Sequence, residues 1–184
     1  MTKTRFTFGK LVALISFVTL FSACDKVKDA LNLSITMEMA NVEFTIPTQQ
    51  VGTQTLAEIS VPFNVDSLIK AKASGFSVNS IRSAKIKSCT LTLLNGTEAN
   101  NFAALSACTA AFSSNNITTP VILAQLTSNP DSYATTLNLP VNSDTELKDY
   151  LKASSFSYVI SGTTRRAITT ALQCKATITY ELGF

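Results

Sequence analysis

Four cysteines carry the most versatile chemistry in this sequence, because a thiol can attack a substrate, bind a metal or form a disulfide. They are Cys24, Cys89, Cys108 and Cys174, in a chain of 184 residues that contains no histidine. Zinc sites usually combine cysteine with histidine or use Cys-x-x-Cys pairs, and the sequence has neither. A nucleophilic cysteine also needs a base, and none is evident. We therefore expect no metal site, no cofactor and no catalytic cysteine.

Other catalytic arrangements are equally hard to assemble from this sequence. Without histidine there is no Ser-His-Asp triad, and the Gly-x-Ser-x-Gly pattern is absent. Two carboxylates could still hydrolyse a glycoside without histidine. However, the acidic residues that cluster most closely in the sequence lie in a segment that we expect to form a solvated helix. They are Asp144, Glu146 and Asp149. The sequence therefore predicts that the protein is not an enzyme, with a histidine-free hydrolase as the remaining catalytic alternative.

The three later cysteines share the parity of apolar neighbours in their strands, which places them on apolar faces. In an oxidising compartment, one disulfide plus one buried thiol is the expected arrangement. We favour a Cys89–Cys108 disulfide because their strands are consecutive. Cys174 is then a buried thiol or an alternative partner, and three buried thiols remain the competing interpretation.

Five basic residues precede or begin two strands of the expected sheet. Arg82, Lys85 and Lys87 form one group, and Arg165 and Arg166 form the other. They could contact an anionic glycan or a lipid headgroup. The alternative is that these charges protect strand edges against aggregation.

The N-terminal segment ends in a distinctive order of residues. The basic residues Lys3, Arg5 and Lys10 precede the apolar stretch 11–21, and Leu20-Phe21-Ser22-Ala23-Cys24 follows. This order resembles a bacterial lipoprotein signal with a lipobox, in the looser form familiar in Bacteroidota. The resemblance implies cleavage before Cys24 and acylation of its thiol and new N-terminus. Two or three acyl chains would anchor the protein stably to a membrane.

A transmembrane helix and an ordinary secretory signal are the alternatives for this N-terminal segment. A transmembrane helix needs about 20 apolar residues, which is more than the stretch provides. A secretory signal cleaved after Ala23 also fits the small residues there. The resemblance to a lipoprotein predicts a cell-envelope location, with the outer membrane as the expected site, and leaves open which face carries the protein.

Removing the signal changes the charge balance. The chain has 15 basic and 12 acidic residues, and three of the basic ones precede Cys24. The remaining chain is therefore neutral, and its charge gives no reason to expect nucleic-acid binding. Residues 24–30 form the lipidated cysteine and a charged tether, and residues 31–184 form one domain.

Alternation of apolar and polar residues with a period of two dominates from residue 31. It changes parity between Met39 and Val42, which predicts a bulge. The expected strands cover 31–46, 56–63, 84–94, 107–113, 120–126, 133–139, 156–161 and 168–182. Turns are expected at Asn95-Gly96 and Gly162, and short helices at 65–73 and 144–153. This pattern predicts an all-β protein: an antiparallel β-sandwich of about eight strands, jelly-roll or Ig-like, with two short helices.

An internal repeat accompanies these elements. The residues Val61-Pro62-Phe63-Asn64, followed by Asp66 and Leu68, resemble Leu139-Pro140-Val141-Asn142, followed by Asp144 and Leu147. Each copy predicts a strand, a short helix and a further strand. The match suggests a pseudo-repeat of two halves, with chance convergence as the alternative.

As a whole the sequence resembles the small Bacteroidota lipoproteins of unknown function, and the specific part of this resemblance ends near residue 30. The resemblance implies that acyl chains on Cys24 attach the protein to a membrane. We expect a non-catalytic binding or scaffolding module for another envelope protein, acting through a sheet face or edge. The alternative is a glycan-binding accessory lipoprotein of a nutrient-uptake system, which should expose a platform of Tyr or Phe side chains.

Overall fold

The computed structural model describes residues 33–184, so the expected signal, Cys24 and the tether lie outside the described residues. The compact unit Ser34–Phe184 is described here. Its eight strands are β1 (Ser34–Ile46), β2 (Gly52–Pro62), β3 (Ser83–Leu93), β4 (Leu105–Ser114), β5 (Val121–Leu126), β6 (Thr136–Leu139), β7 (Ser155–Thr164) and β8 (Leu172–Gly183). The helical elements are α3 (Val65–Lys72) and the 3-10 turns η1 (Val78–Ser80), η2 (Phe102–Ala104) and η3 (Tyr150–Lys152).

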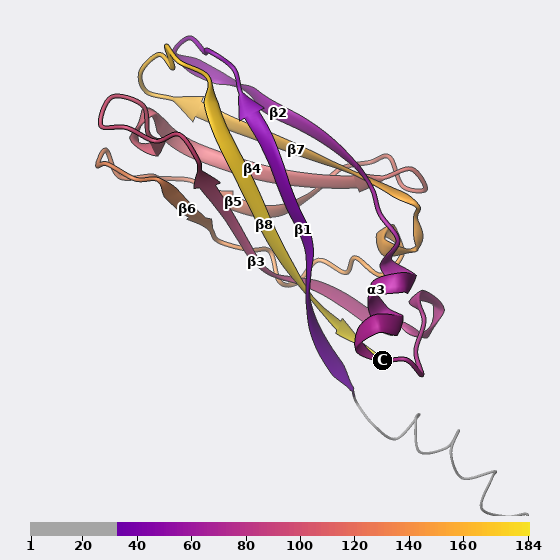
Figure 1. The fold of residues 1–184 in the computed structure, drawn as a ribbon. Coiled ribbons are helices and arrows are strands. Elements are labelled where there is room, and N and C mark those ends of the chain that lie inside the picture. The colour runs from indigo at the N-terminus through magenta and orange to yellow at the C-terminus, as the bar shows by residue number, and fades with distance from the viewer. Residues whose placement is uncertain (1–32) are drawn as a thin grey trace, which may run out of the picture. The chain divides into compact units, whose positions relative to one another are not determined.

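The strands form two antiparallel sheets that pack face to face (Figure 1). The β1 sheet has the order β1-β8-β3-β6, and the β2 sheet has the order β2-β7-β4-β5. Consecutive strands mostly lie in different sheets, so the chain repeatedly crosses between the two layers. The all-β sandwich is thus confirmed, and this strand order is that of a jelly roll.

The strand alternation on which the prediction rested is visible in the burial pattern. Along β7, every second residue is buried, and the others are half-buried on the outer face. The predicted bulge in β1 is confirmed, because the pairing with β8 shifts between Glu38 and Ala40. Phe112 lies at the centre of the core, and its ring contacts the rings of Tyr150, Phe156, Tyr158 and Tyr180.

The first predicted helix is confirmed as α3. Its N-terminus is capped by Asn64, whose side chain accepts a hydrogen bond from the Ser67 amide at 3.0 Å. Asp66 in the first turn and Lys70 in the last pair at 2.5 Å, a favourable order for the helix dipole.

The second predicted helix, 144–153, is wrong. Only the 3-10 turn η3 forms there, because this segment bonds to the start of β3. The Leu147 amide donates to the Ala84 carbonyl at 2.8 Å, and the Glu146 carboxylate accepts from the Ala84 amide at 2.7 Å. Leu147 is fully buried as a result. The Leu147 amide thus bonds to β3 instead of to a preceding carbonyl of its own segment, as it would in a helix.

The predicted turn at Gly162 is also wrong, because Gly162 lies inside β7. A Cβ atom at this position would lie 2.8 Å from Leu56 Cδ1 and 2.9 Å from the Ala107 carbonyl oxygen. Glycine is therefore required here by the close approach of β2 and β4, which is a second common reason for glycine in a strand.

Loops, α3, η1 and η3 cover the end of the sandwich at which β1 begins and β8 ends, which we call the base. Ser34 pairs with Gly183 there, and the ring of Phe76 lies 4.8 Å from that of Phe184. Figure 1 shows α3 and the C-terminus together at this end. None of the helices within residues 33–184 has the length and hydrophobicity that a membrane span requires.

Candidate functional site

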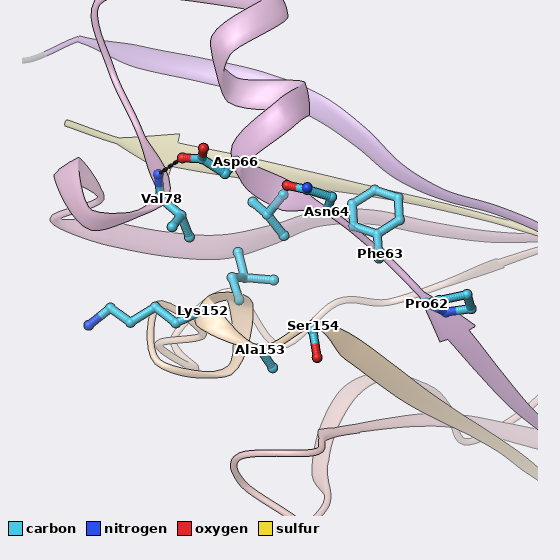
Figure 2. A pocket seen from close by; sticks show the side chains of 10 residues that line it. Pro62, Phe63, Asn64, Asp66, Val78, Lys152, Ala153 and Ser154 are labelled. Carbon is cyan, nitrogen blue, oxygen red and sulfur yellow. Dashed lines mark hydrogen bonds between the residues drawn. The ribbon is translucent and has the colours of Figure 1, made fainter.

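A groove of about 500 Å³ lies at the base, where the chain crosses between the sheets (Figure 2). One wall is formed by residues 62–66 and the other by residues 151–154, with Val78 between them. The walls are joined by a bond of 3.0 Å from the Phe63 amide to the Ser154 carbonyl. Phe63 also packs on Phe156 at a centroid distance of 5.7 Å, which connects the groove to the core.

The polar groups of the groove are mostly engaged with neighbours. Asp66 accepts a bond of 2.9 Å from the Val78 amide, as Figure 2 shows, and pairs with Lys70. The hydrogen bond from Lys70, together with that from the Val78 amide, lowers the pKa of Asp66 below its usual value. Lys152 pairs with Asp149 at 2.8 Å. The groove therefore offers an apolar surface and neutralised charges, a combination that suits a neutral ligand better than an ionic one.

The structure separates the two groups of basic residues that the sequence singled out. Lys85 and Lys87 are exposed near the base, where Lys87 pairs with Glu181 at 3.0 Å. Arg82 lies beside them, and its amide donates to the Gly183 carbonyl at 2.8 Å. Arg165 and Arg166 follow the end of β7, at the opposite end of the sandwich. The five residues therefore do not form a single anion-binding site.

A small hollow of about 310 Å³ at the base is lined by one member of the first group, Lys85. Its polar centre is Glu181, which accepts a hydrogen bond of 2.9 Å from the Ser34 hydroxyl. The bonds from Lys87 and Ser34 lower the pKa of Glu181. The carboxylate therefore stays charged at neutral pH and partly neutralises the lysines around it.

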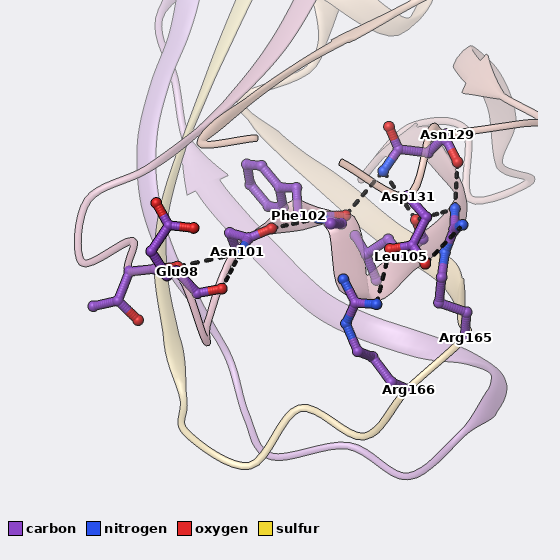
Figure 3. A network of polar contacts seen from close by, with 10 residues as sticks. Glu98, Asn101, Phe102, Leu105, Asn129, Asp131, Arg165 and Arg166 are labelled. Carbon is purple, nitrogen blue, oxygen red and sulfur yellow. Dashed lines mark hydrogen bonds and ion pairs between the residues drawn. The ribbon is translucent and has the colours of Figure 1, made fainter. Parts of the chain in front are cut away.

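Arg165 and Arg166 belong to a polar network that fixes the loops at the far end (Figure 3). The Arg165 guanidinium donates to the carbonyls of Asn129 and Leu105, the latter at 3.2 Å. The Asn129 side chain donates at 2.9 Å to the carbonyls of both Phe102 and Leu105. Arg165 therefore has a structural role in this network.

Arg166 differs from its neighbour, because its contact is an exposed ion pair of 2.8 Å with Asp131. Asp131 directly follows Asn129-Pro130, and its carboxylate also lies 3.9 Å from Arg165. The two arginines thus share one carboxylate but differ in burial and in backbone contacts.

The three cysteines of the domain are buried free thiols, and the expected Cys89–Cys108 disulfide is not formed. The reasoning behind it was wrong because β3 and β4 are consecutive in sequence but lie in different sheets. Burial raises the pKa of Cys89, Cys108 and Cys174 to about 12, so their thiolate fractions are negligible at neutral pH. Among the described residues, no three Cys, Asp or Glu side chains gather in a way that could hold a metal.

One surface that the sequence reasoning missed is the outer face of the β2 sheet. The register of this sheet places fourteen side chains on it: Thr53, Thr55, Glu58, Ser60, Ala107, Thr109, Ala111, Ser113, Ile122, Gln125, Ser157, Val159, Ser161 and Thr163. Glu58 is the single charged residue among them, and it lies on the edge strand β2. Ile122 is 47% exposed, which is high for an apolar side chain.

The outer face of the β1 sheet is different. It carries six charged side chains, which are Glu38, Glu43, Lys85, Lys87, Lys175 and Glu181. The signal for this contrast was present in the sequence, because neither 105–114 nor 155–164 contains a charged residue. Charge depletion at the centre of a patch is typical of protein interfaces.

Comparison with known proteins adds no family to this description. No protein-family model and no curated protein matches the chain. Among solved structures, it is similar to infectious bursal disease virus Gt strain at 13% identity and a TM-score of 0.37, covering 83% of this chain and 33% of that one. The infectious bursal disease virus VP2 subviral particle gives 11% identity and a TM-score of 0.36, with 83% and 32% covered.

The decameric BFDV capsid protein is similar at 11% identity and a TM-score of 0.35, with 82% of this chain and 99% of that chain covered. The chain spans about a third of the length of the first two structures. Structural similarity at these low TM-scores is not evidence of a shared function. The fold assignment therefore depends on the strand order of this chain itself.

Proposed function

We propose that this protein is a lipid-anchored component of a bacterial cell envelope that works as a non-catalytic binding module. The proposed anchor is Cys24, supported by the basic, apolar and small residues that precede it. The proposed binding surface is the outer face of the β2 sheet, and its near absence of charge is the observation that carries the proposal. Covering a face without charges at its centre avoids the large cost of desolvating a charged group, and its Ser and Thr hydroxyls offer hydrogen bonds to a partner.

The test of the anchor compares wild-type cells with cells that carry Cys24→Ala. Metabolic labelling with a palmitate analogue should mark the wild-type protein, and membrane fractionation should find it in the envelope pellet. The variant should lose the label and leave the pellet. A variant that is still pelleted and labelled would refute lipidation at Cys24.

The test of the binding surface is crosslinking in intact cells, followed by capture with an antibody against residues 34–184 and mass spectrometry. An antibody is preferable to a C-terminal tag, because Phe184 is buried at the base. A reproducible protein adduct supports the binding module. A protein recovered without any adduct contradicts it.

The groove of Figure 2 favours glycan binding as a second candidate function. Phe63 and Pro62 supply apolar surface, and the Ser154 hydroxyl, which accepts from the Asn115 side chain, can donate a hydrogen bond to a neutral ligand. This candidate ranks second because the expected platform of aromatic side chains is missing from the described residues. There, Tyr133 is the one aromatic side chain among the large exposed apolar residues. Binding of the domain to a glycan array, lost in Phe63→Ala, would support it.

We also propose that the pseudo-repeat reflects the connectivity of the sandwich. Each strand of one sheet corresponds to the strand four places further along the chain, counted cyclically over the eight strands. The order β1-β8-β3-β6 then becomes β5-β4-β7-β2, which is the order of the other sheet written from its opposite edge. The two sequence copies then occupy equivalent connections, β2 to β3 and β6 to β7. This equivalence pairs β3 with β7.

A further inference from the structure

We infer that the partner covering the outer face of the β2 sheet is a second copy of this chain. The two copies would pack these faces against each other across a two-fold axis that runs parallel to the strands. The inference rests on the proposed function, because it names the occupant of the same surface. Three properties of the face support it: its shape, the position of its one charge and its area.

The shape of the face allows close approach of a second sheet. Its central positions are Thr109 and Ala111 on β4, and Val159 and Ser161 on β7. These side chains are small and alternate regularly, because β4 and β7 are paired without interruption from Ala107 to Ser114. Sheets that pack face to face lie about 10 Å apart, and the small side chains of this face allow a second sheet to approach at least that closely.

The single charge of the face is placed so that two copies do not repel each other. Glu58 lies on β2, at one edge of the sheet, and the proposed axis passes between β7 and β4 at its centre. The axis therefore carries Glu58 over the partner's β5, at the opposite edge. Neighbouring strands are about 4.8 Å apart, so the two carboxylates would be separated by roughly 14 Å across the sheet. Each carboxylate stays at the solvated rim.

The area of the face reaches what a specific dimer needs. Four strands at about 4.8 Å spacing and about 3.3 Å per residue give a face of roughly 19 by 30 Å, or about 600 Å² on each copy. The total of about 1,200 Å² lies at the lower end of the range for stable interfaces. A dimer of this size would be aided by confinement of both copies to one membrane, which raises their effective concentration.

The proposed axis is also compatible with two anchors in one membrane. Rotation about an axis parallel to the strands leaves strand direction unchanged, so Ser34 of both copies lies at the same end of the dimer. An axis across the strands would place the two bases at opposite ends. The proposed anchor thus selects one of the two ways in which the faces can pack.

The experiment uses the full chain in native membranes. Ala111→Cys places a thiol at the centre of the face, and Thr177→Cys is the matched control at the centre of the outer face of the β1 sheet. Cys89, Cys108 and Cys174 are buried and do not interfere. After treatment with a short bismaleimide, Ala111→Cys should give an adduct with the mass of two chains, and Thr177→Cys should remain a monomer.

The other outcomes are decisive as well. An adduct of Ala111→Cys with a different protein would refute the inference that the partner is a second copy of this chain. It would still support the outer face of the β2 sheet as the binding surface. Dimers from both variants would indicate random collision and overturn the inference, as would the absence of any adduct. As a second readout, Ala111→Arg or Val159→Lys should abolish the native dimer in detergent while Thr177→Arg retains it. Unchanged thermal unfolding of the variants would show that folding is not the cause.

Discussion

Replacement of Arg165 by alanine tests whether this residue is structural or contacts a ligand. The guanidinium donates to the carbonyls of Asn129 and Leu105, and the side chain is 26% exposed. After truncation, the Leu105 carbonyl keeps its bond from the Asn129 side chain, at 2.9 Å. The Asn129 carbonyl loses its bond from Arg165, so the cost arises mainly there.

The expected magnitude follows from these contacts. A hydrogen bond that involves a charged group contributes about 1.5–3 kcal/mol. The buried Nε of Arg165 has no hydrogen-bond partner among the described residues. Removing this unsatisfied donor stabilises the variant and offsets part of the loss. We therefore expect Arg165→Ala to lower the free energy of unfolding by about 2 kcal/mol, which for a domain of this size is roughly 4–8 °C in melting temperature.

Arg166→Ala is the matched control, because it removes the same charge from the adjacent position. Its ion pair with Asp131 is half-exposed, and pairs of this kind contribute about 0–1 kcal/mol. Urea unfolding of residues 34–184, followed by circular dichroism, measures both variants. Equal destabilisation by the two substitutions, or none by either, would refute the structural assignment of Arg165.

Three further perturbations have defined outcomes. Gly162→Ala should destabilise the domain by about 1–3 kcal/mol in the same urea assay, because the added Cβ would meet a backbone carbonyl of β4. A variant as stable as wild type would contradict the packing of β7 against β4. The thiols of Cys89, Cys108 and Cys174 should stay unreactive toward a disulfide reagent at pH 8 in the folded domain, and all three should react in denaturant. Fewer than three reactive thiols in denaturant would indicate a disulfide. The domain should also lose stability as the pH rises above about 9, since these thiols, Tyr158 and Tyr180 have raised pKa values and release protons first in the unfolded state. A melting temperature that stays constant from pH 8 to pH 11 would contradict this.

Alternation of polar and apolar residues predicted the strands well because it is a local property. A residue two positions along a strand returns to the same face whatever the partner strand is, so parity alone placed Cys89, Cys108 and Cys174 in the core. The bulge in β1 was visible for the same reason, as a local change of parity.

The failures arose where distant parts of the chain decide the structure. The segment 144–153 has a helix-like beginning, but its Leu147 amide bonds to Ala84 on β3. The strands β3 and β4 follow each other in sequence and still lie in different sheets, which removed the basis of the Cys89–Cys108 disulfide. Likewise, the residues of the uncharged face come from four strands, and only the register gathers them.

The placement of β1 determines how the domain bears mechanical load. A pull on the chain before Ser34, directed along the strands, acts on an edge strand that is hydrogen-bonded to β8 from Ser34 to Ile46. Because the two strands are antiparallel neighbours over this whole length, the pull slides β1 along β8 and strains their hydrogen bonds simultaneously. Opening the same bonds one by one would require a pull across the strands. A domain held by its N-terminal end is thus loaded in shear, the direction in which a pair of strands resists extension best.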